Sequence, residues 1–207
     1  MHEAVEDDRT QRQRLRQSLR ERRAALSQAL VRTASAEVAA EVAALAVFGR
    51  ARRVALYAAT RGEIDPESLR TLCDARGIEV SFPRVVSTDP PRLAFCRVGA
   101  GETLGVGRFG ILEPRADDAV DPALLDLIVV PGVAFARDGH RLGFGHGYYD
   151  RALAGAPGAV RVGLCHDFQL VDRLPPRAGD EPVDLVLTPR ERLLTGARPL
   201  AFEEVPS

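Results

Sequence analysis

The sequence predicts an α/β fold, a three-layer α/β/α sandwich around a mixed, mainly parallel sheet. Short apolar stretches alternate with segments of helical character along the 207 residues. The stretch Asp126–Pro131 contains four consecutive branched apolar residues, which is typical of a central strand buried on both faces. Hydrophobic residues make up 45% of the chain and charged residues 28%, so we expect one globular domain over residues 1–207.

The N-terminal part of the chain predicts two helices. The first runs from Asp8 to about Leu26, with leucines on one stripe. Ser27 is suited to cap the second, which is rich in alanine and valine and reaches about Phe48. The first helix is dense in arginine. Its Arg12 and Arg16, one turn apart, either belong to a solvated face or point jointly at a polyanion.

A β-α-β unit comes next. Val54–Tyr57 and Ile78–Phe82 are the expected strands, and Asp65-Pro66 starts the helix that Gly77 ends. This order predicts a parallel pair with a right-handed crossover. Glu63 follows the first strand, where open α/β sheets place ligand groups; the alternative is a solvated turn carboxylate. Pro83-Arg84, after the second strand, is placed to reach the same cleft.

The second half of the chain contains the remaining strands. Residues 89–122 are rich in proline and glycine, and we interpret this long connection as a lid or rim over the site. Its one expected strand, Leu93–Val98, departs from the parallel order because no helix precedes it. After the central strand come the helix Tyr148–Ala154 and the strands Val160–Cys165 and Val183–Leu187.

Composition excludes several classes of protein. The net charge of −1 does not favour nucleic acid or a membrane surface as a partner. No apolar run is long enough to span a bilayer. The acidic N-terminus lacks signal-peptide features, and three cysteines without metal or redox spacing fit a reducing compartment, so we expect a cytoplasmic protein. All 28 basic residues are arginines, which excludes a P-loop lysine and Schiff-base chemistry. Nucleophile-elbow and zinc spacings are also missing.

A glycine-rich segment is the strongest functional signal. Gly143, Gly145 and Gly147 alternate with other residues between an apolar strand and a helix start. Such a turn presents backbone N–H groups and a positive helix end to an anion, and Arg141 and Arg151 flank it. The alternative interpretation is a tight surface turn that needs glycine for its geometry alone.

Carboxylates and tyrosines accompany this turn. Asp150 stands at the helix start, and Asp180 precedes the last strand, as does Asp184. Two carboxylates with phosphate oxygens are a common Mg²⁺ environment, although Asp150 also suits the helix dipole and Asp180 an Asx turn. Tyr148 and Tyr149 are suited to stack on a heterocycle, and we expect one of them to lie in the core.

These residues resemble the signature of a known family. Arg141-Leu-Gly-Phe-Gly-His-Gly-Tyr-Tyr-Asp150-Arg151, preceded by Val130-Pro-Gly-Val-Ala-Phe135, is similar to the 5-formyltetrahydrofolate cyclo-ligases, also called methenyltetrahydrofolate synthetases. The resemblance spans nearly the whole chain. Its other segments are Arg12-x-x-Leu15-Arg16, Gly62-Glu63-Ile, Phe82-Pro-Arg84, Phe109-Gly-Ile-Leu-Glu-Pro114 and Asp180-Glu-Pro-Val-Asp184.

The resemblance implies a fold like that of the sugar-phosphate isomerase and CoA-transferase group. It implies ATP- and Mg²⁺-dependent cyclisation of 5-formyltetrahydrofolate to 5,10-methenyltetrahydrofolate, with release of ADP and phosphate. ATP would phosphorylate the formyl oxygen, and N10 would then attack the activated carbon. We expect a monomer or weak homodimer with no nucleic-acid or membrane partner.

The resemblance also implies roles for individual residues. The ATP-binding set is Arg12, Arg16, Arg141, Leu142, Gly143, Phe144, Gly145, His146, Gly147, Tyr148 and Tyr149. The folate-binding set is Arg16, Ala58, Glu63, Phe144, Gly145, His146, Gly147 and Tyr148. Arg141 and Tyr148 are the catalytic candidates, and Asp150 and Asp180 the magnesium ligands. Position 12 is typically lysine in this family, and Phe144 and His146 stand where some members carry arginine or lysine.

Two other classes of function remain as alternatives. One is a folate- or nucleotide-binding domain of the same fold without catalysis. The other is a nucleic-acid-binding protein that uses the arginine-rich helix, which salt-dependent binding would reveal and which the near-zero net charge opposes.

Overall fold

The computed structural model describes residues 2–175 and 177–197. Its helices are α1 (His2–Ala24), α2 (Gln28–Ala44), α3 (Ala46–Arg50), α4 (Glu67–Arg76) and α5 (Tyr148–Ala154). Its longer strands are β1 (Arg53–Ala55), β2 (Glu79–Thr88), β3 (Pro91–Arg97), β7 (Leu127–Val130), β8 (Ala134–Ala136), β10 (Val160–Leu164), β12 (Leu185–Leu187) and β13 (Arg192–Leu194). Two-residue strands are β4 (Gly105–Val106), β5 (Leu112–Glu113), β6 (Ala119–Val120), β9 (Arg141–Leu142) and β11 (Leu170–Val171).

The main sheet is mixed and mainly parallel, as the sequence predicts. Within the described residues its eight strands lie in the order β13-β12-β10-β7-β1-β2-β3-β6. The strands from β12 to β2 pair in parallel, whereas β13, β3 and β6 add antiparallel edges. The expected β-α-β unit is β1-α4-β2, and the departure from parallel order falls at β3.

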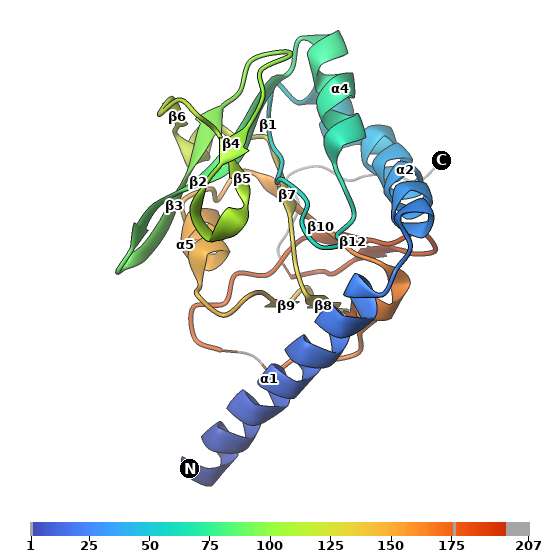
Figure 1. Cartoon of the computed structure of the whole chain (residues 1–207), viewed down its shortest axis with the longest axis vertical. Coiled ribbons are helices and arrows are strands. Elements are labelled where there is room, and N and C mark those ends of the chain that lie inside the picture. Colours follow the sequence, from blue (N-terminus) through green and yellow to red (C-terminus); the bar gives the residue numbers. More distant parts are fainter. Residues whose placement is uncertain (1, 176, 198–207) are drawn as a thin grey trace.

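Helices cover both faces of this sheet (Figure 1). On one face α2, α3 and α4 bury side chains such as Val38, Phe48 and Leu69 against the strands. On the other face Leu153 of α5 packs with residues such as Ile128 and Phe95. The three-layer α/β/α sandwich is therefore confirmed, and burial of these apolar faces is the main force that holds the layers together.

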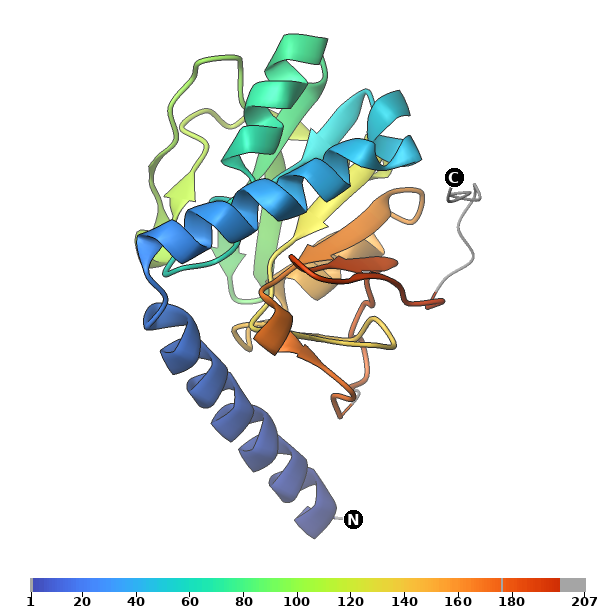
Figure 2. The same ribbon diagram turned by 90° about the vertical axis from the view of Figure 1, so that its right-hand side faces the viewer.

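Helix α1 lies outside these layers and extends beyond them at its N-terminal end (Figure 2). Leu19 packs against a second, three-stranded sheet in the order β11-β8-β9, with neighbours that include Val133 and Leu142. No helix in the described part of the chain has both the length and the apolar character needed to cross a membrane.

Several boundaries differ from the sequence-based expectation. The helix expected to run to Phe48 is broken at Leu45, whose backbone is extended (φ −65°, ψ 133°) and whose side chain is buried, so core packing overrides helix propensity there. Helix α4 begins at Glu67, one residue after Pro66, although the Asp65 carboxylate does accept from the Glu67 N–H at 3.1 Å as a capping group.

Strand β2 was expected to end at Phe82, and this was wrong. Pro83 lies inside β2 and pairs with Phe95 of β3. Its parallel neighbour β1 ends at the Ala55–Ser81 pair, so no ladder on that side requires an N–H from position 83. Arg84 therefore projects from a strand and not from a loop; its guanidinium lies 3.6 Å from Asp117.

Candidate functional site

The glycine-rich turn is entered from a small hairpin and not directly from the central strand. Strand β7 is followed by β8, and β9 returns antiparallel to it with Arg141 opposite Phe135. The expectation that the central strand itself leads into the turn was wrong in this respect. Gly145 (φ 103°) and Gly147 (φ 69°) adopt left-handed conformations that favour glycine.

Gly143 serves a different purpose in this turn. A Cβ at this position would lie 2.6 Å from Nη1 of Arg141, so the missing side chain leaves room for the guanidinium. Gly147 then precedes α5 without a side-chain cap on the first amides of the helix. Leu142 is fully buried, whereas Phe144, Gly145 and His146 are exposed, so the turn presents itself to solvent from a fixed base.

Arg141 and Asp150 face each other across the turn. Their Nη2 and Oδ1 atoms are 2.9 Å apart, and the two side chains are only 6% and 20% exposed. Asp150 also accepts from the Glu181 N–H at 3.4 Å, which ties the start of α5 to the segment that carries Asp180. The guanidinium of Arg141 lies over the Tyr149 ring, 5.5 Å from its centre.

Helix α1 brings two more guanidinium groups to the same place. Nε of Arg16 donates to the Gly143 carbonyl at 2.9 Å. Arg12 lies 3.3 Å from Asp180 and also donates to the Pro175 carbonyl. Burial first, and then the nearby charges of Arg12, Arg177 and Arg20, lower the pKa of Arg16. Such crowding of like charges favours an anionic ligand.

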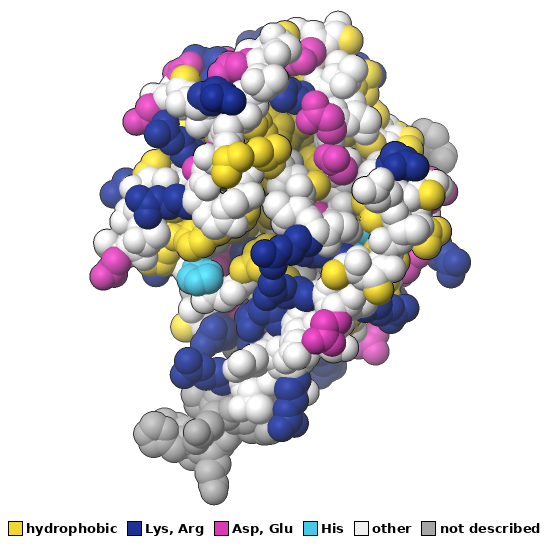
Figure 3. Space-filling model, viewed as in Figure 1, with side chains coloured by type: hydrophobic (Ala, Val, Ile, Leu, Met, Phe, Trp, Pro, Cys, Tyr) yellow, Lys and Arg dark blue, Asp and Glu magenta, His cyan; other side chains and the backbone are white. Residues whose placement is uncertain are grey.

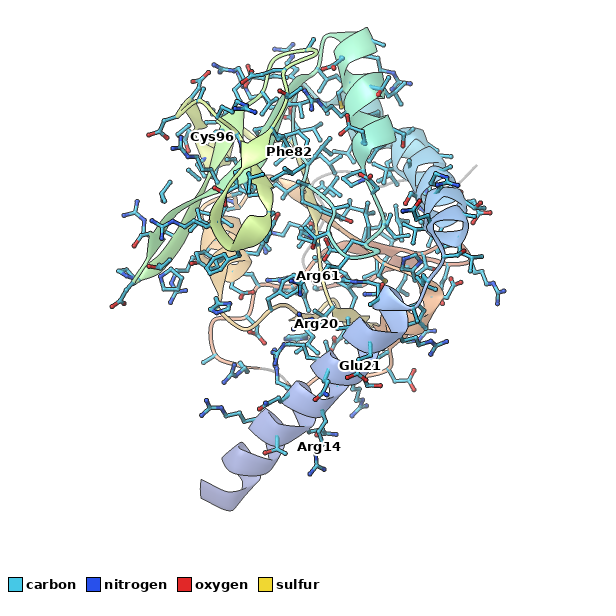
Figure 4. All side chains as sticks on the ribbon, in the orientation of Figure 1. Arg14, Arg20, Glu21, Arg61, Phe82 and Cys96 are labelled. Atoms are coloured by element: carbon cyan, nitrogen blue, oxygen red, sulfur yellow. The ribbon has the colours of Figure 1, made fainter. Side chains whose placement is uncertain are left out.

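The surface reflects this arrangement. Basic side chains gather where α1 meets the body of the molecule (Figure 3). Arg20 projects from α1 toward that body, whereas Arg14 projects away from it (Figure 4). Arg12 is buried and Arg16 half-buried, so the solvated-face interpretation does not fit these two arginines, and their contact with a polyanion stays a prediction.

Glu63 is buried, and its interpretation as a solvated turn carboxylate was wrong. Its side chain is 6% exposed, and Oε1 lies 3.0 Å from Nη1 of Arg23. Oε2 accepts from the Thr60 N–H at 2.9 Å. Burial raises the pKa of Glu63, while Arg23 and Thr60 oppose the rise. Ala58 lies half-buried in the same loop after β1. Sequence reasoning missed Arg23 as a partner of Glu63.

The two tyrosines separate as expected. Tyr149 packs against the core, with its ring edge-on to Phe95 and the two ring centres 6.4 Å apart. Burial raises the pKa of Tyr149, and its hydroxyl has no partner among the described residues. Tyr148 is half-buried, and the centre of its ring lies 6.4 Å from the centre of the Phe109 ring. Phe109 also stacks on His146 at 6.0 Å, so the long connection between β3 and β7 does reach the glycine turn.

Asp150 and Asp180 fit a magnesium ion that arrives with a phosphorylated ligand. Both carboxylates lie at the arginine cluster, joined through Glu181. The described residues contain no cluster of three or more acidic, histidine or cysteine side chains able to hold a metal alone. Mg²⁺ commonly binds one or two carboxylates and completes its shell with water and phosphate oxygens. Asp184 is different, because it is buried and accepts from the Arg161 N–H at 2.8 Å.

The main sheet is mainly parallel and covered by helices on both faces, which defines an α/β protein. Guanidinium groups and a glycine turn lie together in this fold and form a candidate anion-binding site. The model of the 5-formyltetrahydrofolate cyclo-ligase family matches residues 8–189. The chain belongs to this family.

Individual relatives align with this chain over most of their length. The 5-formyltetrahydrofolate cyclo-ligase of Escherichia coli (strain K12) is 31% identical over 175 residues, which cover 83% of this chain and 96% of the relative. The enzyme of Haemophilus influenzae is 30% identical over 176 residues, 83% and 94% of the two chains. The solved structure of Aquifex aeolicus 5,10-methenyltetrahydrofolate synthetase superposes with a TM-score of 0.80 at 35% identity, covering 93% of this chain and 97% of that one.

A second solved structure supports the fold alone. The 5,10-methenyltetrahydrofolate synthetase of Mycoplasma pneumoniae is 22% identical and gives a TM-score of 0.69, with 86% of this chain and 99% of that one covered.

Proposed function

We propose that the protein catalyses the ATP- and Mg²⁺-dependent cyclisation of 5-formyltetrahydrofolate to 5,10-methenyltetrahydrofolate, releasing ADP and phosphate. Family membership supports the folate reaction. The observation that carries the ATP requirement is that Arg16 and Arg141 contact the glycine turn and its following helix, while Arg12, one helical turn from Arg16, contacts Asp180 in the neighbouring loop. The free thiols in the structure are buried, which suits a cytoplasmic protein, and we expect a monomer or weak homodimer.

We assign the triphosphate of ATP to the glycine turn. The residues proposed to contact ATP are Arg12, Arg16 and those from Arg141 to Tyr149. The amide groups of the turn and the three guanidinium groups stabilise phosphate oxygens, and Arg12 acts as a guanidinium where the family usually has an ammonium. Asp150 and Asp180 are the proposed magnesium ligands; when bound, Mg²⁺ supplies positive charge to the phosphate oxygens.

The folate lies beside this site in the proposal. Its contacts are Arg16, Ala58, Glu63 and the segment from Phe144 to Tyr148. Glu63 offers a carboxylate that accepts N–H groups of the pterin, and Tyr148 offers an aromatic face or a phenolic hydrogen bond. Phe109, in the long connection between β3 and β7, contacts His146 and Tyr148 of the same segment.

The proposed chemistry needs no covalent protein nucleophile. The formyl oxygen of the N5-amide is a poor leaving group, so it first attacks the γ-phosphate of ATP; the bond to the β-phosphate oxygen breaks, ADP leaves, and an iminophosphate-type intermediate forms. N10 then attacks the activated carbon and loses its proton to solvent, and the bond from that carbon to oxygen breaks as phosphate departs. Arg141 neutralises the charge that develops on the transferring phosphoryl group, and the surrounding side chains hold the two substrates in line. Positioning and charge stabilisation are the main contributions of the protein.

One assay tests this proposal. Purified protein is incubated with 5-formyltetrahydrofolate, ATP and Mg²⁺ while the methenyl chromophore is followed in the near ultraviolet. The signal should appear with all components and vanish when ATP is omitted or a chelator is added. Tight folate binding without any methenyl product would instead indicate the non-catalytic domain, and product formation without ATP would refute the mechanism.

A further inference from the structure

One face of α1 carries three arginines that reach the site. Arg12, Arg16 and Arg23 are separated by four and seven residues, a spacing that keeps side chains near one stripe of a helix. Arg16 contacts the glycine turn assigned to ATP, and Arg12 contacts Asp180, a proposed magnesium ligand. Arg23, in the last turn of the helix, contacts a different part of the site, the loop that carries Glu63.

The Arg23 guanidinium is buried and donates to backbone and carboxylate oxygens. Its Nη1 lies 3.0 Å from Oε1 of Glu63 and 3.5 Å from the Gly132 carbonyl oxygen. Its Nε donates to the Arg61 carbonyl at 3.2 Å. The side chain is 2% exposed. Arg23 therefore joins α1 to the loops that follow β1 and β7, two adjacent strands of the parallel sheet.

The turn that carries Glu63, residues 60–63, has little conformational freedom. Arg61 (φ 48°) and Gly62 (φ 78°) are consecutive left-handed residues, which is unusual for an arginine. A Cβ at position 62 would lie 2.9 Å from the Arg23 carbonyl oxygen, so α1 packs directly on this turn. On its other side the Gly62 carbonyl accepts from Nε2 of His166 at 2.9 Å.

We propose that Arg23 is a positioning residue of the folate site, which keeps Glu63 ionised and fixes its carboxylate in the orientation that the substrate requires. This inference rests on the proposed role of Glu63 as a folate contact. It adds a role for the N-terminal helix, which then serves the folate as well as the nucleotide.

Electrostatics support the proposal. The titratable and polar groups near Glu63 come from three elements. Tyr57, Thr60 and Asp65 belong to its own loop, Arg23 to α1 and Tyr149 to α5. Arg141 lies next to Tyr149, and His166 lies next to Arg23. Arg23 is the cation that touches the carboxylate. Burial already raises the pKa of Glu63, and loss of the cation would raise it further, so a neutral acid would replace the carboxylate.

The test compares Arg23→Gln with Arg23→Lys. Glutamine keeps hydrogen-bonding capacity but removes the charge, whereas lysine keeps the charge without the planar fork. In Arg23→Gln we expect the KM for 5-formyltetrahydrofolate to rise about tenfold or more, while the KM for ATP stays within about twofold. Arg23→Lys should restore part of the folate affinity.

The pH profile separates positioning from general damage. Between about pH 6 and about pH 8.5 the folate KM of the wild type should change less with pH than that of Arg23→Gln, because Arg23 favours the ionised form of Glu63. In Arg23→Gln it should fall as pH rises, since deprotonation restores the carboxylate. Calorimetric titration with 5-formyltetrahydrofolate alone should give the same trend in Kd. Arg22→Gln is the matched control, because Arg22 lies over the Phe168 ring at 4.3 Å and faces elsewhere; its folate KM should match the wild type.

The outcomes are distinguishable. An inactive wild type contradicts the proposed function, whatever the variants do. An active wild type with an unchanged folate KM and pH profile in folded Arg23→Gln overturns the role of Arg23, as does an equal rise in the KM values for folate and ATP. Should Arg23→Gln fail to fold by circular dichroism, Arg23→Lys decides the question. In Arg23→Lys, a folate KM that is raised at every pH supports the proposal, and a wild-type folate KM refutes it.

Discussion

Arg12 in α1 and Asp180 near the end of the described chain lie 168 residues apart in sequence and form a 3.3 Å ion pair. Both side chains are shielded, at 8% and 15% exposed. Asp180 also accepts from the Arg177 N–H at 3.1 Å, so this loop is tied both to itself and to the N-terminal helix. The site therefore depends on contacts between the two ends of the fold.

Replacement of Arg12 tests this contact. Arg12→Ala should raise the KM for ATP by about tenfold to about a hundredfold, because it removes a phosphate ligand and the partner of Asp180. Arg12→Lys keeps the charge and should lose much less. Initial rates at varied ATP measure the effect, with exposed Arg9→Ala on the same helix as control. A wild-type KM in Arg12→Ala would exclude Arg12 from the nucleotide site.

Arg141 and Asp150 are expected to matter for turnover more than for folding. Arg141→Ala should lower kcat by about a hundredfold to about a thousandfold, as expected when a donor to developing charge is removed. Asp150→Ala should lower turnover severely as well, and extra Mg²⁺ should recover part of it. Circular dichroism should be unchanged in both variants. Wild-type rates in both would refute the assignment of the site.

Local signals in the sequence were sufficient to predict the frame of the molecule. The β1-α4-β2 unit, the central β7 and the start of α5 each follow from apolar runs, turn residues and caps over a few positions. The glycine turn and Asp150 are close in sequence, so their proximity was predictable. The small sheet β11-β8-β9 was not predicted, because strands of two or three residues carry almost no periodicity.

The pairs that complete the site could not be found in the same way. Arg23 and Glu63 are 40 residues apart, and an arginine-rich helix offers many candidate partners. The one available signal was the helical spacing of Arg23 from Arg16 and Arg12, which places it on their stripe. Burial of Glu63 also depends on how α1 packs across the loop, which is a tertiary property.

Gly163 should be needed for packing between the two sheets. A Cβ on this β10 residue would lie 2.4 Å from the Phe135 ring, which is fully buried on β8. Gly163→Ala should therefore destabilise the fold by about 1–3 kcal/mol through overpacking. Gly49→Ala, where nothing lies within 4 Å inside α3, should be neutral or stabilising by up to about 1 kcal/mol. Urea unfolding measures both, and equal midpoints would show that Phe135 moves aside without cost.

His166 should make stability depend on pH in the mildly acidic range. It is buried, its Nε2–H donates to the Gly62 carbonyl, and burial is the largest cause that lowers its pKa. In the unfolded chain the pKa returns to about 6.5, so the unfolded state binds the proton more readily than the folded state. The contribution of His166 to stability is thus fully present above about pH 6.5 and is lost as pH falls toward the lowered folded value.

The measurement is urea unfolding of wild type and His166→Gln from about pH 7.5 down to about pH 5. Glutamine keeps an N–H donor without a titrating ring, so its free energy of unfolding should fall less steeply over this range. His140→Gln, a change in the β8–β9 turn that leaves His166 in place, should keep the wild-type slope. Parallel slopes for wild type and His166→Gln would mean that the buried imidazole takes up its proton without unfolding the chain, and that the Gly62 carbonyl still accepts from it in the charged form.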